Sequence, residues 1–133
     1  MKLSPTITIE VKPDYFVFVN DDVKYVFETC INYKLQDGEP VPVAIGESQE
    51  IPDTTLLRLF DPESGTDIDK FGFLRLFLEY GIGKTFEKRT FPVLKPLVIF
   101  KGAETLQKEL LGYHYGILQY AGLLAGAREV VFE

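Results

Sequence analysis

The stretch that decides the fold is 95-KPLVIFKGAETLQKELLGYHYGILQYAGLLAGAREVVFE-133. It contains two short apolar runs, at residues 97–100 and 130–132, that lack the alternation of a strand with one exposed face. Between them, residues 103–124 have the apolar spacing of one long helix. The stretch therefore predicts a βαβ unit, in which a crossover helix joins two parallel strands that are covered on both faces.

The predicted long helix has one apolar stripe and one pair of glycines. Gly112 and Gly116 lie four residues apart, and each costs about 1 kcal/mol of helix stability relative to Ala. Close approach of another backbone would compensate this cost, so we expect a contact there. The predicted core-facing stripe advances in alternating steps of four and three residues: Leu106, Leu110, Tyr113, Ile117, Tyr120 and Leu124.

The first 45 residues predict an antiparallel meander. Residues 6–11 alternate strictly between apolar and polar, and residues 15–19 form a second apolar segment. A turn signal at residues 20–22 precedes residues 23–35, which alternate throughout and predict one long strand. Residues 41–45 are predicted as a short edge strand, since prolines flank and interrupt it.

A second helix is predicted from Thr66, with Asp69 three residues later as in a capping box, to a stop at Gly81 and Gly83. This helix is apolar around so much of its circumference that it must be covered on two sides. In a domain this small, a partner is one way to cover it. The predicted interaction residues are therefore Phe71, Phe73, Phe77 and Tyr80 on this helix, with Gly112 and Gly116 on the other.

Composition limits the possible functions. The chain has 133 residues, 46% of them apolar, which predicts a single domain over residues 1–133. A net charge of -6 argues against a nucleic-acid partner, because phosphate binding needs a basic face. The single Cys30 fits a reducing cytoplasm, which is the expected location. We expect no catalytic residues, no metal and no cofactor.

Three motifs suggest chemistry, and each has a simpler explanation. Gly81-Ile82-Gly83-Lys84-Thr85 resembles the end of a phosphate loop, but Leu78 stands where the loop needs Gly, and a helix precedes the motif instead of a strand. His114 is the chain's one histidine and Cys30 is far from it in sequence, so His114 lacks the partners of a zinc site. The acids at positions 61, 63, 67 and 69 are explained by turns and helix capping. A nucleotide binder or small enzyme that uses residues 81–85 stays open as an alternative.

A membrane interaction is the third alternative. Residues 110–127 carry no formal charge over 18 positions, but they include four Gly, three Tyr, His114 and Gln119, so we expect no membrane span. A membrane-surface adaptor would instead use the basic residues Lys84, Lys88, Arg89 and Lys95.

The order of predicted elements resembles the ribonuclease H-like fold, which is also half of an actin-type domain. Residues 125–130, AGAREV, look like the helix end and strand start of the bacterial actin-like MreB family. Residues 95–99 and 41–47 are similar to two further strands of that family, and residues 69–80 stand where its first helix lies. The resemblance implies an α/β fold, with a ribonuclease H-like mixed sheet and two main helices.

The turn at residues 10–14 departs from the family. The family has a glycine-bearing phosphate loop there, whereas this chain has Glu10-Val11-Lys12-Pro13-Asp14. Proline has no N–H and a fixed φ, so the backbone cannot wrap a phosphate in the same way. The resemblance therefore implies a truncated, degenerate actin-like subdomain. We expect a non-catalytic protein-interaction or assembly module, whose partner is another protein or a second copy in a homodimer.

Overall fold

The computed structural model describes residues 5–87 and 94–133. The larger of its two sheets is mixed and has five strands. Its strand order is β3-β2-β1-β7-β8. The pairs β1–β2 and β2–β3 are antiparallel, whereas β7 runs parallel to both β1 and β8. The predicted βαβ unit is thus present, and the predicted meander is present over residues 6–28, whereas residues 30–45 belong to a second sheet. The strands are β1 (Thr6–Val11), β2 (Tyr15–Asn20), β3 (Val23–Glu28), β7 (Leu97–Lys101) and β8 (Glu129–Phe132).

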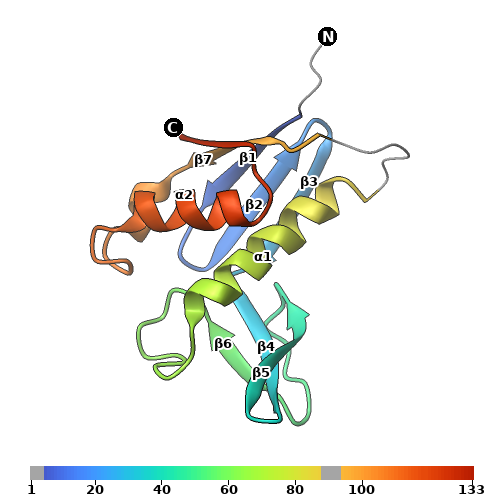
Figure 1. The fold of residues 1–133 in the computed structure, drawn as a ribbon, viewed down its shortest axis with the longest axis vertical. Coiled ribbons are helices and arrows are strands. Elements are labelled where there is room, and N and C mark those ends of the chain that lie inside the picture. The colour runs from blue at the N-terminus through green and yellow to red at the C-terminus, as the bar shows by residue number, and fades with distance from the viewer. Residues whose placement is uncertain (1–4, 88–93) are drawn as a thin grey trace.

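Two helices, α1 (Lys70–Thr85) and α2 (His114–Leu124), lie on one face of this sheet (Figure 1). The strand residues beneath them are fully buried: Ile7, Ile9, Phe16, Phe18, Val98 and Phe100. Aromatic packing joins α1 to the sheet, since the ring of Phe77 lies 5.5 Å from Phe16 and 5.9 Å from Phe18. The expectation that both faces of β8 are covered is wrong, because Val131 on the opposite face is 40% exposed.

A smaller antiparallel sheet lies beside the start of α1 (Figure 1). It consists of β5 (Glu39–Ile45), β4 (Cys30–Gln36) and β6 (Thr55–Arg58), in that order. The buried Ile31 and Leu57 join its inner face to the core of the large sheet in one apolar cluster. The assignment of the whole chain, residues 1–133, to a single domain stays a prediction.

The predicted long strand over residues 23–35 is wrong, because the chain changes sheets at Thr29. The Thr29 hydroxyl donates to the Pro13 carbonyl oxygen at 2.5 Å, and the Thr29 N–H donates to the Asp14 carbonyl oxygen at 3.0 Å. These bonds hold Thr29 against the turn after β1. The alternation of apolar and polar residues runs through Thr29 without interruption, from β3 into β4. The periodicity of residues 23–35 therefore did not reveal the bend.

The predicted boundaries of the first helix are also wrong at both ends. The helix is capped by Asp69, whose Oδ1 accepts hydrogen bonds from the N–H groups of Phe71 and Gly72. It continues through Gly81 and Gly83 to Thr85. Tertiary packing explains Gly81, since a Cβ there would lie 2.2 Å from the Phe18 ring. The glycine is thus a contact point between helix and sheet, not a stop.

The predicted single helix over residues 103–124 is broken in two. A 3-10 turn, η1 (Ala103–Leu106), is followed by further turns, and α2 begins only at His114. Leu111 and Gly112 have left-handed backbone conformations, with φ of 52° and 84°. The Gly112 N–H donates to the Gln107 carbonyl oxygen at 2.8 Å, which closes the turn. Gly112 therefore precedes α2 and does not share a helical face with Gly116.

The break changes which side of the helix is buried. In α2 the buried residues are His114, Leu118, Ala121 and Gly122, so the stripe predicted through Tyr113, Tyr120 and Leu124 is wrong. Small residues on the buried side allow α2 to lie close to the sheet: a Cβ on Gly122 would be 3.0 Å from Val130 Cγ2. The larger apolar side chains are left on the outside.

Within residues 5–87 and 94–133, no helix has the length and apolar character needed to cross a membrane. The uncharged stretch at residues 110–127 contains only the 11 residues of α2 in helical form.

Candidate functional site

The turn between β1 and β2 lies at the carboxyl ends of the parallel strands, where open α/β sheets commonly bind ligands. In this turn the Lys12 N–H donates to the Tyr15 carbonyl oxygen at 3.1 Å, and Pro13 has no N–H. Of the three turn residues, only Asp14 has an N–H left to offer, and its carboxylate would repel a phosphate. The turn therefore does not supply the row of N–H groups with which a backbone loop holds phosphate.

The protein's own groups occupy the neighbouring strand ends. The Thr105 hydroxyl donates to the Val11 carbonyl oxygen at 3.0 Å, across 94 residues of sequence. Gly102, with φ of 79°, lies so close that a Cβ there would be 3.2 Å from the same oxygen. The end of β1 is thus linked to the residues that follow β7 by contacts within the chain.

The Gly81–Thr85 motif forms the last turns of α1 and is not a loop. The Thr85 hydroxyl donates to the Ile82 carbonyl oxygen at 2.8 Å, so it is used within the helix. Lys84 Nζ lies 3.2 Å from Glu87 Oε1 and 5.4 Å from the centre of the Tyr80 ring. The hydrogen bond to Glu87 raises the pKa of Lys84. This geometry is that of a helix end with a paired lysine.

The acidic cluster serves turns and a cap. Asp61 Oδ1 accepts a hydrogen bond from the Glu63 N–H at 2.9 Å, and Asp69 caps α1. In the described part of the chain, no group of three or more His, Cys, Asp or Glu side chains is placed to hold a metal ion.

The two remaining candidates for chemistry, Cys30 and His114, are both buried. Burial raises the pKa of the Cys30 thiol to about 11, so the reactive thiolate is strongly disfavoured. His114 lies 4.2 Å from the Tyr115 ring, and its Nδ1 has no hydrogen-bond partner among the described residues.

The predicted interaction residues occupy three different environments. Phe73 and Phe77 are buried in the core, and Tyr80 is half-buried against the ring of Phe27 at 5.1 Å. Phe71 stacks on Tyr120 at 5.4 Å and so joins α1 to α2. Gly112 and Gly116 are exposed, and a Cβ added to either would meet no atom within 4 Å. The structure therefore does not bring the six residues together.

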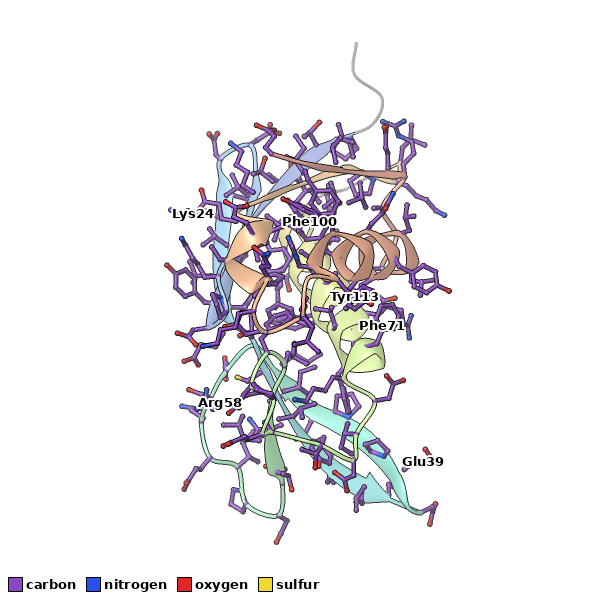
Figure 2. The ribbon with its side chains drawn as sticks, turned by 90° about the vertical axis from the view of Figure 1, so that its left-hand side faces the viewer. Lys24, Glu39, Arg58, Phe71, Phe100 and Tyr113 are labelled. Atoms are coloured by element: carbon purple, nitrogen blue, oxygen red, sulfur yellow. The ribbon has the colours of Figure 1, made fainter. Side chains whose placement is uncertain are left out.

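An exposed apolar surface lies on the outer side of α2 and the turn before it. We call it the α2 patch, and Figure 2 labels Tyr113 there. Leu111 is 82% exposed, Tyr113 72% and Tyr120 59%. Gly116 lies among these side chains on the same helical face. The α2 patch consists of Leu111, Tyr113, Tyr120, Leu123 and Leu124, all exposed.

Sequence reasoning missed most of the α2 patch, because it assigned Tyr113, Tyr120 and Leu124 to the core. A signal was present: Ala121, Gly122 and Ala125 are the small residues that a helix needs on the side facing a sheet. If these small residues face the sheet, the geometry of a helix places Tyr113 and Tyr120 on the opposite, exposed side. Leu111 and Leu123 were not singled out at all.

Comparisons with known proteins give matches among solved structures only. No protein-family model matches the chain, and no curated protein does. A non-polymerising mutant of MamK bound to AMPPNP aligns with a TM-score of 0.63 and 9% identity, over 99% of this chain and 41% of its own. MreB5 of Spiroplasma citri bound to AMPPNP aligns with a TM-score of 0.61 and 14% identity, over 100% and 39%. The ADP-bound form of MreB5 of Spiroplasma citri aligns with a TM-score of 0.57 and 13% identity, over 98% of this chain and 38% of its own.

The chain thus spans about two fifths of the length of these solved structures. The alignments cover nearly the whole of this chain. At such low identity the likeness establishes the fold and nothing further. The protein has the actin-like, ribonuclease H-like fold that its sequence predicted.

Proposed function

We propose that this chain is a non-catalytic assembly module of the actin-like fold that associates with a second copy of itself through the α2 patch. The observation that carries the proposal is the exposure of five large apolar side chains on α2 and the turn before it. Residues 110–127 around it have no formally charged side chain. Single exposed apolar residues are ordinary, but a contiguous group of this kind is typical of a contact site.

Charge supports a second copy as the partner. Two chains of net charge -6 repel each other, so they meet most favourably where neither surface carries charge. The α2 patch is such a surface, and a two-fold axis would place it against itself. Gly116, with open space above it, would let the two helices approach closely.

The size of the α2 patch supports a weak association. Its five side chains expose on the order of 500 Å². A stable dimer buries about 800 Å² on each partner. The α2 patch supplies much of this area but not all of it, so we expect association in the micromolar range.

Sedimentation velocity over a range of concentrations tests this proposal. The native chain should show a concentration-dependent dimer. Leu123→Lys, which places a charge in the α2 patch, should leave only monomer, and Gly116→Leu should weaken the dimer by keeping the helices apart. Val26→Lys is the matched control, since Val26 is 56% exposed on the opposite face of the large sheet. A native chain that stays monomeric, or a dimer that Val26→Lys disrupts equally, contradicts the proposal.

The absence of nucleotide binding is the second part of the proposal. It is supported by Pro13 and by the internally bonded Lys12 in the turn after β1. A ligand present at a hundred times its Kd would add about 2.7 kcal/mol to the free energy of unfolding. We expect ATP and ADP, with or without magnesium, to leave the Tm unchanged. A rise in Tm with either nucleotide would refute this part without affecting the dimer.

The remaining expectations belong to the same proposal. We place the module in the bacterial cytoplasm, with a protein partner and no nucleic acid. Of the four basic residues of the membrane-surface alternative, Lys88 and Arg89 lie outside the described residues, and Lys84 pairs with Glu87.

A further inference from the structure

Leu111 is an apolar side chain that a strained backbone holds at the surface. Its φ of 52° lies in the left-handed region, which few residues other than glycine adopt. The side chain is 82% exposed, more than any other large apolar side chain in the described part of the chain. Burial within one copy therefore does not offset the cost of this conformation. Strained residues of this kind are common at contact and ligand sites.

A mainly apolar cavity lies where three segments meet: the residues after β6, the start of α1, and the residues at and before the start of α2. Its volume is about 210 Å³. An apolar cavity of about 150 Å³ holds a benzene molecule in another protein, so this cavity has room for the side chain of a leucine. The apolar side chains of its wall include Leu59, Phe71, Leu74, Leu110 and Ile117.

Three charged residues also belong to the wall, and their polar atoms are directed into the protein's own bonds or interior. Lys70 Nζ donates to the main-chain oxygen of Asp61, and Asp61 Oδ1 accepts a hydrogen bond from the Glu63 N–H. Glu109 Oε2 is buried. The surface that the cavity offers to an occupant is therefore mainly apolar, and an apolar side chain fits it.

Leu111 and this cavity are neighbours on one surface. Leu111 lines an adjoining hollow that shares residues 60–62 and Glu109 with the cavity. Phe71 of the cavity wall stacks on Tyr120 of the α2 patch. A two-fold axis that passes between Leu111 and the cavity exchanges the two, so that each Leu111 meets the cavity of the other copy.

The area of the α2 patch leaves room for such a contact. The patch exposes on the order of 500 Å², whereas a stable dimer buries about 800 Å² on each copy. The cavity wall adds apolar surface directly beside the patch. Residues 110–127 carry no formal charge, so two acidic chains meet here without repulsion between nearby side chains. Area and charge thus both favour a second copy as the occupant.

We propose that Leu111 of each copy inserts into the apolar cavity of the other copy, between Leu74 and Ile117, as the central contact of the dimer. This inference rests on the proposed function, because it names the contact that holds two α2 patches together. An apolar anchor in a pocket of the partner is the usual form of a binding hot spot. Burial of Leu111 in the dimer offsets the cost of its left-handed conformation.

Intermolecular nuclear Overhauser contacts test the insertion in the native chain. Copies with ¹³C-labelled leucine methyl groups are mixed with deuterated copies in which only the isoleucine methyl groups carry protons. The Leu111 methyl groups should show contacts with Ile117 of the other copy, and those of Leu35 should show none. If sedimentation shows a dimer without the contact from Leu111 to Ile117, the insertion is overturned and the proposed function stands. A native chain that stays monomeric overturns both.

Two variants of Leu111 separate the side chain from its backbone conformation. Leu111→Ala should raise the Kd of the dimer at least about tenfold, because it removes the anchor. Leu111→Asn should weaken the dimer as much, although asparagine adopts the left-handed conformation readily and so keeps the turn. Leu35→Ala is the matched control, since Leu35 is 65% exposed near the end of β4, and it should leave the Kd unchanged. An intact dimer in Leu111→Asn, or equal effects at positions 35 and 111, overturns the insertion.

A mixture of two variants tests the cavity. Ile117→Phe enlarges a wall side chain and fills the cavity of its own copy, so it should not dimerise alone. Mixed with Leu111→Ala, it should form a mixed dimer, because one Leu111 then meets one open cavity. Circular dichroism reports whether each variant folds. Leu74→Phe replaces Ile117→Phe if the latter does not fold, and if neither folds the contact in the native chain decides. Folded variants whose mixture dimerises no better than either alone overturn the insertion.

Discussion

Gly81 of α1 lies directly against the ring of Phe18 on β2, so that a Cβ at position 81 would be 2.2 Å from Phe18 Cζ. The Phe18 ring also contacts Phe77, one turn earlier on the same helix. The missing side chain at position 81 lets the helix approach the sheet at the centre of the core. A residue that looks like a helix stop is thus part of the main packing contact between helix and sheet.

Gly81→Ala should lower the free energy of unfolding by about 1–3 kcal/mol, because the added methyl group forces Phe18 or the helix to move. Gly83→Ala is the control, since it lies in the same helix with no atom within 4 Å of its Cβ position. That change should raise the free energy of unfolding by up to about 1 kcal/mol through helix propensity. Urea denaturation measures both, and a neutral or stabilising Gly81→Ala would contradict the packing argument.

Asp69→Ala should lower the free energy of unfolding by about 1 kcal/mol, because Phe71 and Gly72 lose their side-chain acceptor. Thr66→Ala, at the start expected from the sequence, should change it by less than about 0.5 kcal/mol, as exposed substitutions usually do. Thermal unfolding of the two variants distinguishes the two positions. A larger loss of unfolding free energy in Thr66→Ala than in Asp69→Ala would indicate that the helix begins at Thr66, as the sequence predicted.

Asn32→Asp should lower the free energy of unfolding by about 2–3 kcal/mol. The buried Asn32 amide donates to the main-chain oxygens of Glu47 and Gln49, both at 3.2 Å, and accepts from the Thr54 hydroxyl. An aspartate would face the two carbonyl oxygens with acceptors only. Gln36→Glu, the same chemical change at the exposed end of β4, should have little effect. Chemical denaturation compares the pair, and equal effects would exclude a special role for the buried amide.

Cys30 should resist a thiol reagent at pH 8 in the native chain and react fully in guanidinium chloride. Its pKa of about 11 lies above the ordinary cysteine value of 9.0, mainly because burial disfavours the thiolate. The stability that this thiol contributes is therefore complete below about pH 9 and is lost as the pH rises toward about 11.

Cys30→Ala should remove that part of the pH dependence while leaving the contributions of other groups in place. Unfolding curves between pH 8 and about pH 11 for the native chain and the variant supply the comparison. Rapid labelling of the native thiol, or identical pH profiles of the two proteins, would show that Cys30 is accessible.

Local patterns predicted the strands and their directions well, because a buried strand is recognisable from its own residues. The runs at residues 97–100 and 130–132 are parallel strands as expected, and the alternation at residues 6–11 is that of β1. Local patterns failed where the chain had to bend. Thr29 turns the chain between sheets through bonds to Pro13 and Asp14, about 15 residues away, and no pattern within residues 23–35 contains that information.

The candidate contact surface could be predicted only in part. Of the predicted interaction residues, Gly116 is exposed and Phe71 is half-buried, whereas Phe73 and Phe77 lie in the core. An apolar side chain on a helix has the same sequence signature whether it faces a sheet or a partner. Only the direction of the sheet distinguishes the two cases.

The sequence by itself determined the class of the fold, because the spacing and composition of short segments dictate which strands are buried and where helices form. It also determined the altered turn after β1, since Pro13 lacks an N–H in any structure. The tertiary structure alone decided the break at Leu111 and Gly112, and with it the outward direction of Tyr113 and Tyr120. The physical reason is that helical phase is set by the small residues that pack against a distant strand, and this contact exists only once the chain has folded.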